Sequence, residues 1–518
     1  MKKFFTLVTA LVLATGAFAE DYTDTLTVTV NGASTGQTAT ISLNQNENGT
    51  YNFSLKNFIL GSGKDQMAIG NINLNNVVGE TKDGVLSMSV DRNIKIVPGD
   101  DPSVKAWMGP AISAMGAIPV RMIAEQRGEK LYTVINIDLS KTMHQIINVV
   151  FGDGGYQIPN SGFENFHTAK LGTVSSDEPN AWHSFQTASG AFAAFANTVH
   201  NFKSTNAHSG SYSAKLVATN AVITIANGTM TTGRMNAGSW TASSSDNHAS
   251  LDMSVTDKDG NGDPYYVVMN GQPDSLAVWV KFGQGTATPA HPYATVSAII
   301  TDGTYYQDPE DKSYSNKLAE ARNRTIAATN DQWKRISIPF SYIDRSVKGK
   351  AILITISTNA DAGQGSEGDS ILVDDISLIY NAPKATAISV KGDAVEGFEA
   401  GKSVEISNKY TNLSAEDIVV TTDNDNAKVF KTMEEKNGTT TVTIKVASND
   451  LNSVATYTLV MPGTTIPTGV KAIEVNDAET TNAPTEIYNV AGQRVNDMQP
   501  GQVYVVKKGG KTVKVLKK

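Results

Sequence analysis

Short runs of alternating apolar and polar residues recur along almost the whole chain of 518 residues, and turn signals separate them. A clear case is Thr25-Leu-Thr-Val-Thr-Val30, which Asn31-Gly32 follows. Such alternation predicts a half-buried strand, and Asn-Gly predicts a tight turn. Long helical patterns are rare, whereas threonine, asparagine, serine and glycine are abundant. The sequence therefore predicts an all-β protein with several domains.

Residues 1–19 have the pattern of a secretory signal peptide. Lys2-Lys3 gives a positive start, an apolar stretch runs from Phe4 to Phe18, and Ala17-Phe-Ala19 is a small-x-small cleavage site. No later stretch approaches about 18 consecutive apolar residues, so we expect no transmembrane span. We therefore expect an exported protein that is extracellular, on the cell surface or in the periplasm.

Composition excludes several classes of function. Cysteine is absent, which removes disulfides, a catalytic cysteine, cysteine-ligated zinc and a lipid anchor on an N-terminal cysteine. The net charge of −8 argues against nucleic acid as a partner. The seven histidines show no His-x-x-x-His spacing, and the chain has no Gly-x-Ser-x-Gly elbow, P-loop or dinucleotide fingerprint. We therefore predict no catalytic residues.

Residues 20–152 form the first predicted domain. Its phrases Gly49-Thr-Tyr-Asn-Phe-Ser-Leu-Lys-Asn-Phe58, Ile69-Gly-Asn-Ile-Asn-Leu74, Ile118-Pro-Val120 and Ile146-Ile-Asn-Val-Val-Phe-Gly152 resemble the calycin-like domain of secreted proteins from gut Bacteroidetes. The resemblance implies a small antiparallel barrel related to lipocalins. A barrel of about eight strands can hold one small ligand or be filled by its own side chains. Bulky apolar residues at the inward positions favour the filled interior.

Residues 155–381 form the large central domain. It contains Asn160-Ser-Gly-Phe-Glu164, Ser209-Gly-Ser-Tyr-Ser213, Thr232-Gly-Arg234, Gln272-Pro-Asp-Ser-Leu276 and Val373-Asp-Asp-Ile-Ser-Leu378. In this order the phrases resemble the carbohydrate-metabolism domain of Bacteroidetes secreted proteins and, more distantly, jelly-roll carbohydrate-binding modules. The resemblance implies a jelly-roll β-sandwich whose first and last strands lie close together, and a polysaccharide or oligosaccharide as partner.

The remainder is predicted to contain three further segments. Residues 384–462 read as a small immunoglobulin-like β-sandwich that acts as a spacer, and residues 463–484 read as a linker. Residues 485–518 resemble the C-terminal sorting domain of type IX secretion, which implies docking on secretion or surface-attachment machinery. Residues 507–518 hold six lysines. These lysines also fit an alternative, a solvated edge strand protected against aggregation.

The two ends of the central domain suggest a structural calcium. Strand alternation puts Asp374 on the same face as three apolar residues, Leu372, Ile376 and Leu378. A carboxylate there is costly unless it is paired or bound to metal, and Glu164 on the opening strand is the expected partner. The related carbohydrate-binding modules hold calcium in this corner, which implies Glu164 and Asp374 as ligands with a carbonyl from Ser209. In the alternative, both carboxylates accept hydrogen bonds from turn amides without metal.

A second, weaker metal candidate is Asp257-Lys-Asp-Gly-Asn-Gly-Asp263, which matches the first half of an EF-hand loop. Asp257, Asp259, Asn261 and Asp263 would be its ligands. The glutamate at position twelve is missing, because residue 268 is Val. The alternative is an ordinary polar hairpin.

Sugar-binding sites use exposed aromatic rings beside amides and carboxylates. Trp182 and Trp240 lie in predicted loops beside asparagine and histidine, and Tyr305 and Tyr306 follow Asp302-Gly303. These four residues are the candidate ligand-binding residues. The alternative is that they anchor the loops as buried apolar groups.

Taken together, these features predict a secreted or surface glycan-binding protein that assists polysaccharide use without catalysis. One alternative is a glycoside hydrolase or another carbohydrate-active enzyme that works in the concave face of the jelly roll. Another alternative is a structural surface protein or adhesin.

Overall fold

The computed structural model describes residues 19–30, 33–61, 66–196, 198–222, 224–343, 345–407, 410, 412–462, 486–489, 492–496, 498–499, 502–508 and 511–516. Almost all of its regular structure is strand, which confirms the all-β prediction. The described helices, Gly109–Ala114 (α1), Ser140–Met143 (α2) and Ala193–Ala196 (α3), are short. None of them is long and apolar enough to cross a membrane. Nearly all of the predicted signal peptide and the predicted linker lie outside the described residues.

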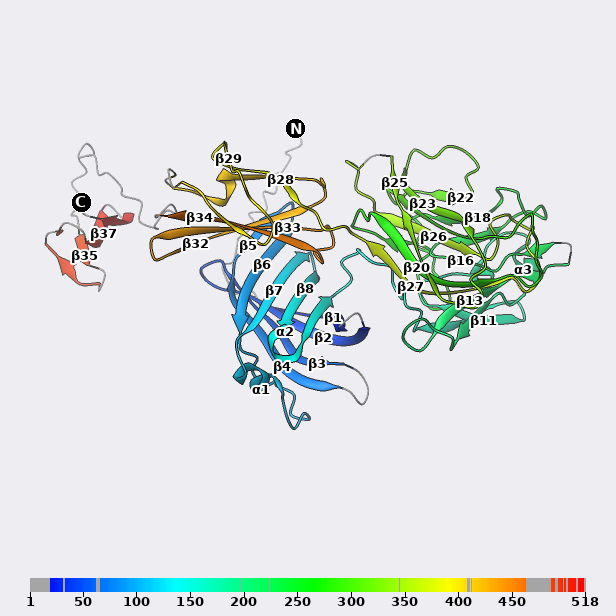
Figure 1. The fold of residues 1–518 in the computed structure, drawn as a ribbon, viewed down its shortest axis with the longest axis horizontal. Coiled ribbons are helices and arrows are strands. Elements are labelled where there is room, and N and C mark those ends of the chain that lie inside the picture. Colours follow the sequence, from blue (N-terminus) through cyan, green and yellow to red (C-terminus); the bar gives the residue numbers. More distant parts are fainter. Residues whose placement is uncertain are drawn as a thin grey trace, which may run out of the picture. The chain divides into compact units, whose positions relative to one another are not determined.

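The N-terminal part is a nearly closed antiparallel barrel (Figure 1). Its strands pair in the order β4-β3-β2-β1-β9-β8-β7-β6-β5. The first strand of the domain, β1, therefore pairs with its last strand, β9. The bounds are Ala19–Val30 (β1), Ala33–Gln45 (β2), Tyr51–Leu60 (β3), Met67–Val77 (β4), Gly79–Lys82 (β5), Val85–Ile94 (β6), Ile118–Arg127 (β7), Lys130–Leu139 (β8) and Gln145–Phe151 (β9).

The interior of the barrel is filled with apolar side chains. Because successive residues of a strand point to opposite faces, one residue in two faces inward. Along β3, Phe53 and Leu55 are fully buried, and Ile135 of β8 and Phe151 of β9 join them in one continuous core. This packing agrees with the filled interior that the sequence favours.

The central part is a sandwich of two main antiparallel sheets. The five-stranded sheet has the order β12-β13-β27-β20-β24, with bounds Asn201–Ser204, Ser213–Val217, Ser370–Ile379, Ser275–Gly283 and Lys334–Pro339. The second sheet has the order β16-β26-β21-β23-β25, with bounds Thr229–Thr231, Ala351–Ser357, Ala294–Thr301, Lys317–Ile326 and Ser341–Tyr342. The short strand β19 (Val267–Val268) also pairs with β26.

Smaller sheets complete this part. They are the hairpin β10–β11 (Phe166–Leu171 and Val174–Pro179), the pair β14–β15 (Thr219–Asn220 and Ile225–Ala226) and the three-stranded sheet β17-β18-β22 (Arg234–Ala237, Asn247–Leu251 and Tyr306–Asp308). A 3₁₀ turn, η2, covers Phe185–Thr187.

The opening and closing segments of the sandwich lie side by side, as predicted. The Gln157 side chain donates to the carbonyl of Leu378 at 2.8 Å and accepts from its amide at 2.9 Å. The amide of Ile376 donates to the carbonyl of Ser161 at 3.0 Å. The side chain of Gln157 therefore extends the hydrogen bonding along the closing strand.

The closing strand β27 does not alternate regularly, which corrects one expectation from the sequence. Ala277 of β20 pairs with Ser377 of β27, and Trp279 of β20 pairs with Asp374 of β27. The same interval therefore contains one more residue on β27 than on β20. This is a β-bulge, and Asp375 within it has a positive φ of 45°. The bulge shifts the alternation: Asp374 is buried, as expected, but Leu372 is not among the buried residues of the strand.

By contacts the chain divides into two compact units, one up to Asn381 together with Ser448–Ser453, and one with the rest from Ala382. In the second unit, the sheets β29-β28-β31 and β30-β34-β33-β32 enclose an apolar core that contains Ile444 and Leu459. Their bounds are Asp393–Ala394, Ala385–Val390 and Ile418–Thr422, and Ser403–Glu405, Val454–Pro462, Thr439–Ala447 and Lys428–Lys436. A short 3₁₀ turn, η3 (Ala415–Asp417), precedes β31.

The tail forms a small sheet in the order β36-β35-β37-β38. The bounds of these strands are Arg494–Val495, Glu486–Asn489, Val503–Lys508 and Lys511–Leu516.

Candidate functional site

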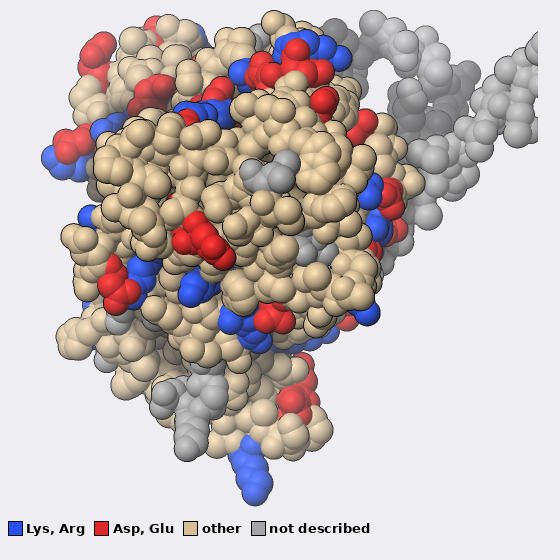
Figure 2. All heavy atoms as spheres, turned by 90° about the vertical axis from the view of Figure 1, so that its right-hand side faces the viewer, with Lys and Arg blue, Asp and Glu red and all other residues tan. Residues whose placement is uncertain are grey.

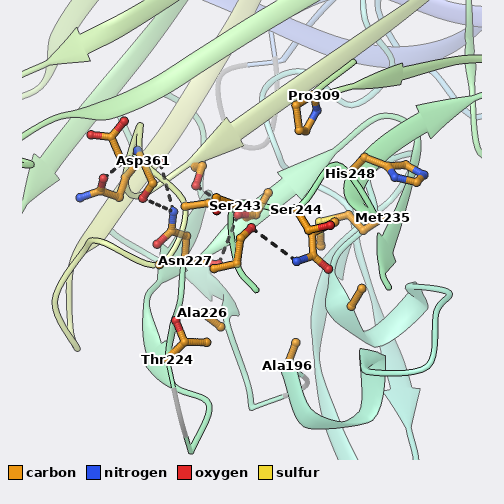
Figure 3. Close-up of a pocket in the computed structure, with 18 of the residues that line it drawn as sticks. Ala196, Thr224, Ala226, Asn227, Met235, Ser243, Ser244, His248, Pro309 and Asp361 are labelled. Carbon is orange, nitrogen blue, oxygen red and sulfur yellow. Dashed lines mark hydrogen bonds between the residues drawn. The ribbon is translucent and has the colours of Figure 1, made fainter. Parts of the chain in front are cut away.

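A groove of about 680 Å³ lies in the central sandwich (Figure 3). Its floor is the sheet that contains β21, β23 and β26, and alternation decides which residues face it. On β21, Thr295 and Ser297 line the groove, whereas Val296 and Ala298 between and beyond them are fully buried in the core. The floor is therefore polar, although the strands that form it are mostly apolar.

One wall of the groove is aromatic. The ring of Trp240 lies 4.4 Å from Phe192 and 4.9 Å from Phe195, measured between ring centroids. Trp240 is 45% exposed and Phe195 is 50% exposed, although both are large apolar side chains. Exposed aromatic groups that gather in one place mark a binding surface more often than single ones do.

Ion pairs cross the floor of the groove. The Arg322 guanidinium donates to Asp308 at 2.9 Å, and the hydroxyl of Ser297 donates to the other oxygen of Asp308 at 3.1 Å. Nearby, Asp361 accepts hydrogen bonds from His291 at 2.8 Å and from Arg324 at 2.9 Å. The two aspartates that line the groove are thus held by positively charged or polar neighbours.

The pKa of Asp361 is lowered, mainly by the hydrogen bond from His291; burial acts in the opposite direction, and the nearby Arg324 lowers the pKa further. This direction favours the ionised carboxylate. A general acid needs the opposite, a pKa raised toward the working pH. Asp361 is therefore suited to binding and orienting groups and not to donating a proton.

Asn227 also lines the groove (Figure 3). Its amide nitrogen donates to the carbonyl of Asn359 at 3.2 Å. Its side-chain oxygen is buried and has no hydrogen-bond partner within the described part of the chain. A buried acceptor without a partner costs about 1–3 kcal/mol.

The face of the sandwich in Figure 2 carries interspersed charges of both signs among mostly uncharged residues. A surface of this kind does not select strongly for a highly charged polymer.

Of the four aromatic residues predicted to bind a ligand, only Trp240 lines the groove. Tyr305 is 41% exposed, but it is not among the residues that line this groove, and its hydroxyl donates to Gln307 at 2.8 Å. The prediction is wrong for Trp182 and Tyr306, because both are fully buried. The alternative reading, that such residues anchor loops, applies to them.

The two buried rings have structural contacts. Trp182 packs against Phe163 with ring centroids 5.4 Å apart, and its indole nitrogen donates to the carbonyl of Pro159. Tyr306 belongs to an apolar cluster with Leu251 and Leu353. A predicted loop position therefore does not determine exposure: Trp182 is buried, whereas Trp240 is 45% exposed.

Sequence reasoning missed Phe192 and Phe195. The segment Ala191-Phe-Ala-Ala-Phe-Ala196 is apolar throughout and contains the single-turn helix α3. The available signal was the spacing of three residues, which places both rings on one face of a helical turn.

The residues predicted to bind calcium converge on one turn, 208–212. Glu164 accepts hydrogen bonds from the amides of Ser211 and Tyr212 at 2.8 and 3.1 Å. Asp374 accepts from the amides of His208 and Ser209 at 2.8 and 3.3 Å. This is the arrangement of the metal-free alternative, since the N–H groups occupy carboxylate oxygens that a cation would need. The calcium site stays a prediction.

Burial raises the pKa of Asp374 to about 7, and repulsion from Asp375 adds to the effect. The backbone amides of His208, Ser209 and Asp375 act in the opposite direction but do not cancel it. Of its neighbours, Asp375 is itself held by the imidazole of His208 at 2.7 Å and by the hydroxyl of Ser209 at 2.9 Å.

The residues of the second metal candidate point in different directions. Asp257 pairs with Arg234 at 2.7 Å. One oxygen of Asp259 accepts from the amides of Asn261 and Asp263, as in an ordinary turn. Asp263 accepts from the amide of Ala181 and from the Asn261 side chain. The second oxygen of Asp259 faces inward, toward histidines from other segments.

Comparison with known proteins identifies one part of the chain. Residues 18–153 match the family model described as "Calycin-like beta-barrel domain", which agrees with the resemblance of this segment and with the barrel. No curated protein matches the chain. A solved structure titled as that of a "putative outer membrane protein" from Bacteroides fragilis NCTC 9343 is similar over 65% of this chain and 97% of its own, with 11% identity and a TM-score of 0.17. A TM-score this low carries no argument about function.

Proposed function

We propose that this protein is an exported, non-catalytic glycan-binding protein whose central sandwich holds a polysaccharide or oligosaccharide in the groove beside Trp240. The barrel and the second unit serve as accessory modules. The observation that carries the proposal is the pairing of an exposed aromatic wall with a polar floor in one groove.

Sugar rings match this pairing chemically. The C–H faces of a pyranose stack on aromatic rings, and its hydroxyls form hydrogen bonds with the polar groups around them. Trp240 and Phe195 offer the faces, while Arg322 and Asn227 are among the polar side chains that line the groove. The volume of about 680 Å³ lies within the range of roughly 300–1,000 Å³ that is usual for ligand sites.

A hydrolase in the same groove is less well supported. Glycoside hydrolysis needs two carboxyl groups across the bond, one of which must donate a proton. Asp308 is bound to Arg322 and Ser297, and the lowered pKa of Asp361 keeps that group ionised. Binding without turnover is therefore the function that this groove favours.

Export and origin belong to the same proposal. The signal-peptide pattern of residues 1–19 and the sorting-like tail support a protein that leaves the cytoplasm and docks on secretion or surface machinery. The resemblances of the first two domains favour a Bacteroidetes source and a role in polysaccharide use.

The test is binding to a panel of purified plant and microbial polysaccharides, followed by calorimetry with fragments of any that bind. Trp240→Ala should weaken binding about 10- to 100-fold, since one stacked ring contributes roughly 1.5–3 kcal/mol. Tyr305→Ala is the matched control, because it removes an equally exposed ring outside the groove. Unchanged binding by Trp240→Ala would place the site elsewhere, and no binding to any glycan would support the structural or adhesin alternative.

A further inference from the structure

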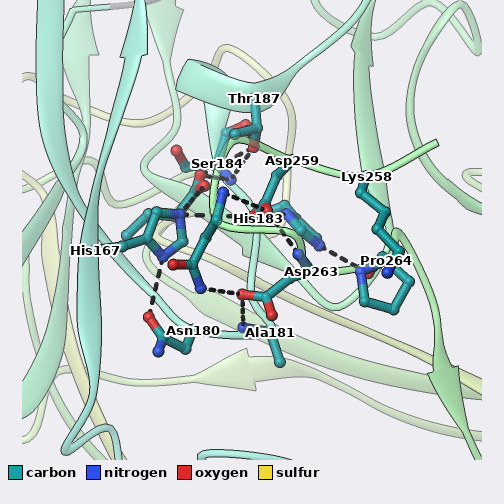
Figure 4. A network of polar contacts seen from close by, with 12 residues as sticks. His167, Asn180, Ala181, His183, Ser184, Thr187, Lys258, Asp259, Asp263 and Pro264 are labelled. Carbon is teal, nitrogen blue, oxygen red and sulfur yellow. Dashed lines mark hydrogen bonds and ion pairs between the residues drawn. The ribbon is translucent and has the colours of Figure 1, made fainter.

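Two overlapping groups of side chains that could hold a metal ion lie in the central sandwich (Figure 4): His167 with Asp259 and Asp263, and Glu178 with His183 and Asp259. None of these residues lines the groove described above. His167 on β10 and Glu178 on β11 are cross-strand partners of one hairpin, so antiparallel pairing alone sets them side by side. His183 pairs with Thr231 through a β-bridge, and Asp259 comes from the 257–263 loop. Segments as far apart as residues 167 and 259 thus meet at one point.

Three short contacts join four atoms of these two groups. The Nε2 atom of His167 is 3.5 Å from Oε2 of Glu178 and 3.5 Å from Oδ2 of Asp259. The Nδ1 atom of His183 is 3.6 Å from the same oxygen of Asp259. The side chains of Glu178, His183 and Asp259 are completely buried, and that of His167 is 13% exposed. In the part of the chain that the structure describes, none of these four atoms makes a hydrogen bond.

The other polar atom of each histidine is occupied, and this fixes which nitrogen carries the proton. The Nε2 atom of His183 lies 3.1 Å from the carbonyl of Pro264, which can only accept. Nε2 therefore carries hydrogen, and Nδ1 of the neutral ring presents a lone pair to the cluster. Nδ1 of His167 lies 3.1 Å from the side-chain oxygen of Asn180, so Nδ1 carries the hydrogen. Nε2 of the neutral ring then presents its lone pair to the cluster.

The outer oxygens of the two carboxylates are also held. Oε1 of Glu178 accepts from the amide of Ser184 at 2.5 Å and from the hydroxyl of Thr187 at 3.0 Å. Oδ1 of Asp259 accepts from the amides of Asn261 and Asp263 at 2.9 and 2.8 Å. Outer partners of this kind orient the ligands of protein-bound metals.

Two imidazole lone pairs and two carboxylate oxygens that face each other in the interior require a positive charge among them. A proton on one histidine satisfies this only in part, since charge-assisted hydrogen bonds are about 2.7–2.9 Å long and these contacts are 3.5–3.6 Å. A tetrahedral cation with bonds of about 2.0–2.1 Å holds its ligand atoms roughly 3.3–3.4 Å apart. The three short contacts are closer in length to the second arrangement than to the first.

We propose that His167, Glu178, His183 and Asp259 bind one divalent transition-metal ion, and that the ion is zinc. Asp263 also lies close to His167 and Asp259, but its Oδ2 accepts from the amide of Ala181 and from the Asn261 side chain, so it is left out of the ligand set. The remaining two neutral imidazoles and two carboxylates form a neutral complex with a dication, which suits burial. Calcium prefers six to eight oxygen ligands, so imidazole nitrogens argue against it. All four positions come from the protein, which is typical of a structural zinc. The ion joins the β10–β11 hairpin and the 257–263 loop to the sandwich.

The experiment uses the full chain, stripped of metal with a chelator that is then removed. Titration with zinc chloride in a calorimeter should show one high-affinity site, and bound zinc should raise the melting temperature. Glu178→Gln and Asp259→Asn should each weaken zinc binding by about 100-fold or more. Asp257→Asn is the matched control, since it changes an exposed carboxylate of the same loop that pairs with Arg234. Binding to the two variants as tight as to the natural chain would overturn the assignment.

Cobalt on the natural chain provides a readout that does not depend on the folding of any variant. Co²⁺ in this site should show the strong visible absorption of four-coordinate cobalt, and zinc should abolish it. A weak six-coordinate spectrum, preference for calcium over zinc, or no metal bound would each overturn the proposal. In the last case, a protonated histidine between the two carboxylates would be the whole explanation of the cluster.

Discussion

The barrel and the central sandwich have similar strands but use their interiors differently. In the barrel, inward residues such as Phe53, Leu55 and Phe151 form one apolar core. The sandwich buries Trp182 and Tyr306 in the same way, but it also buries Glu178, His183 and Asp374, and it keeps a polar groove open. The difference shows that fold class alone does not locate function, since buried polar groups are retained only where partners satisfy them.

The largest effect is expected in the barrel. Phe53 is completely buried, so Phe53→Ala should lower the free energy of unfolding of this domain by about 3–5 kcal/mol. Chemical denaturation followed by fluorescence and circular dichroism measures the change. Phe195→Ala in the sandwich is the control: it removes the same ring from a half-exposed position beside Trp240 and should lower stability by only about 1–1.5 kcal/mol. Equal losses in the two variants would mean that the barrel interior is not a packed core.

The second largest effect that we expect is a pH dependence of the stability of the sandwich. Because the pKa of Asp374 is raised from 3.8 to about 7, the folded state binds this proton more tightly than the unfolded state does. The contribution of Asp374 to stability is therefore fully present below about pH 4 and is lost as the pH rises toward 7, by up to about 4 kcal/mol. Denaturation at pH 5 and pH 8 should show the decline in the natural chain, and Asp374→Asn should remove most of it. A variant with an unchanged pH dependence would exclude Asp374 as its source.

Adding or removing calcium tests the same buried carboxylate of the sandwich, Asp374, in a second way. A calcium ion bound by Glu164, Asp374 and a carbonyl of Ser209 would keep Asp374 ionised and raise the melting temperature of the sandwich. Chelator should then lower that temperature, and calcium should restore it while suppressing the pH dependence. If neither addition shifts the transition, the hydrogen bonds from the 208–212 turn are the complete account of these carboxylates.

The smallest effect is expected at the groove. Asn227→Ala removes a polar side chain that lines the groove and should weaken glycan binding by about 1 kcal/mol, or roughly fivefold, because one hydrogen bond to the ligand is lost. Asn316→Ala is the control, since that amide donates to the backbone of Thr304 and Tyr305 and does not line the groove. An equal loss in both variants would point to a general change in the sandwich.

The fold was more predictable from the sequence than the site. Alternation such as Thr25-Leu-Thr-Val-Thr-Val30 is imposed by one-sided burial and can be read directly. The bulge at Asp375 cannot be read this way, because it depends on how β27 pairs with β20. The proximity of His167 and Asp259 could not be predicted either, because the two residues are far apart in the sequence and belong to no common local motif. Only the pairing of His167 with Glu178 had a local origin, in a hairpin that turns at Gly172.

The contact between the two ends of the sandwich has a consequence for how this domain can be handled. The hydroxyl of Tyr380 donates to the carbonyl of Tyr156 at 2.9 Å, next to the double hydrogen bond between Gln157 and Leu378. A domain that begins and ends at one place can be inserted into a surface loop of another protein as a cassette. Its termini can also be joined and reopened elsewhere, so a circular permutant cut at an exposed loop should keep the fold.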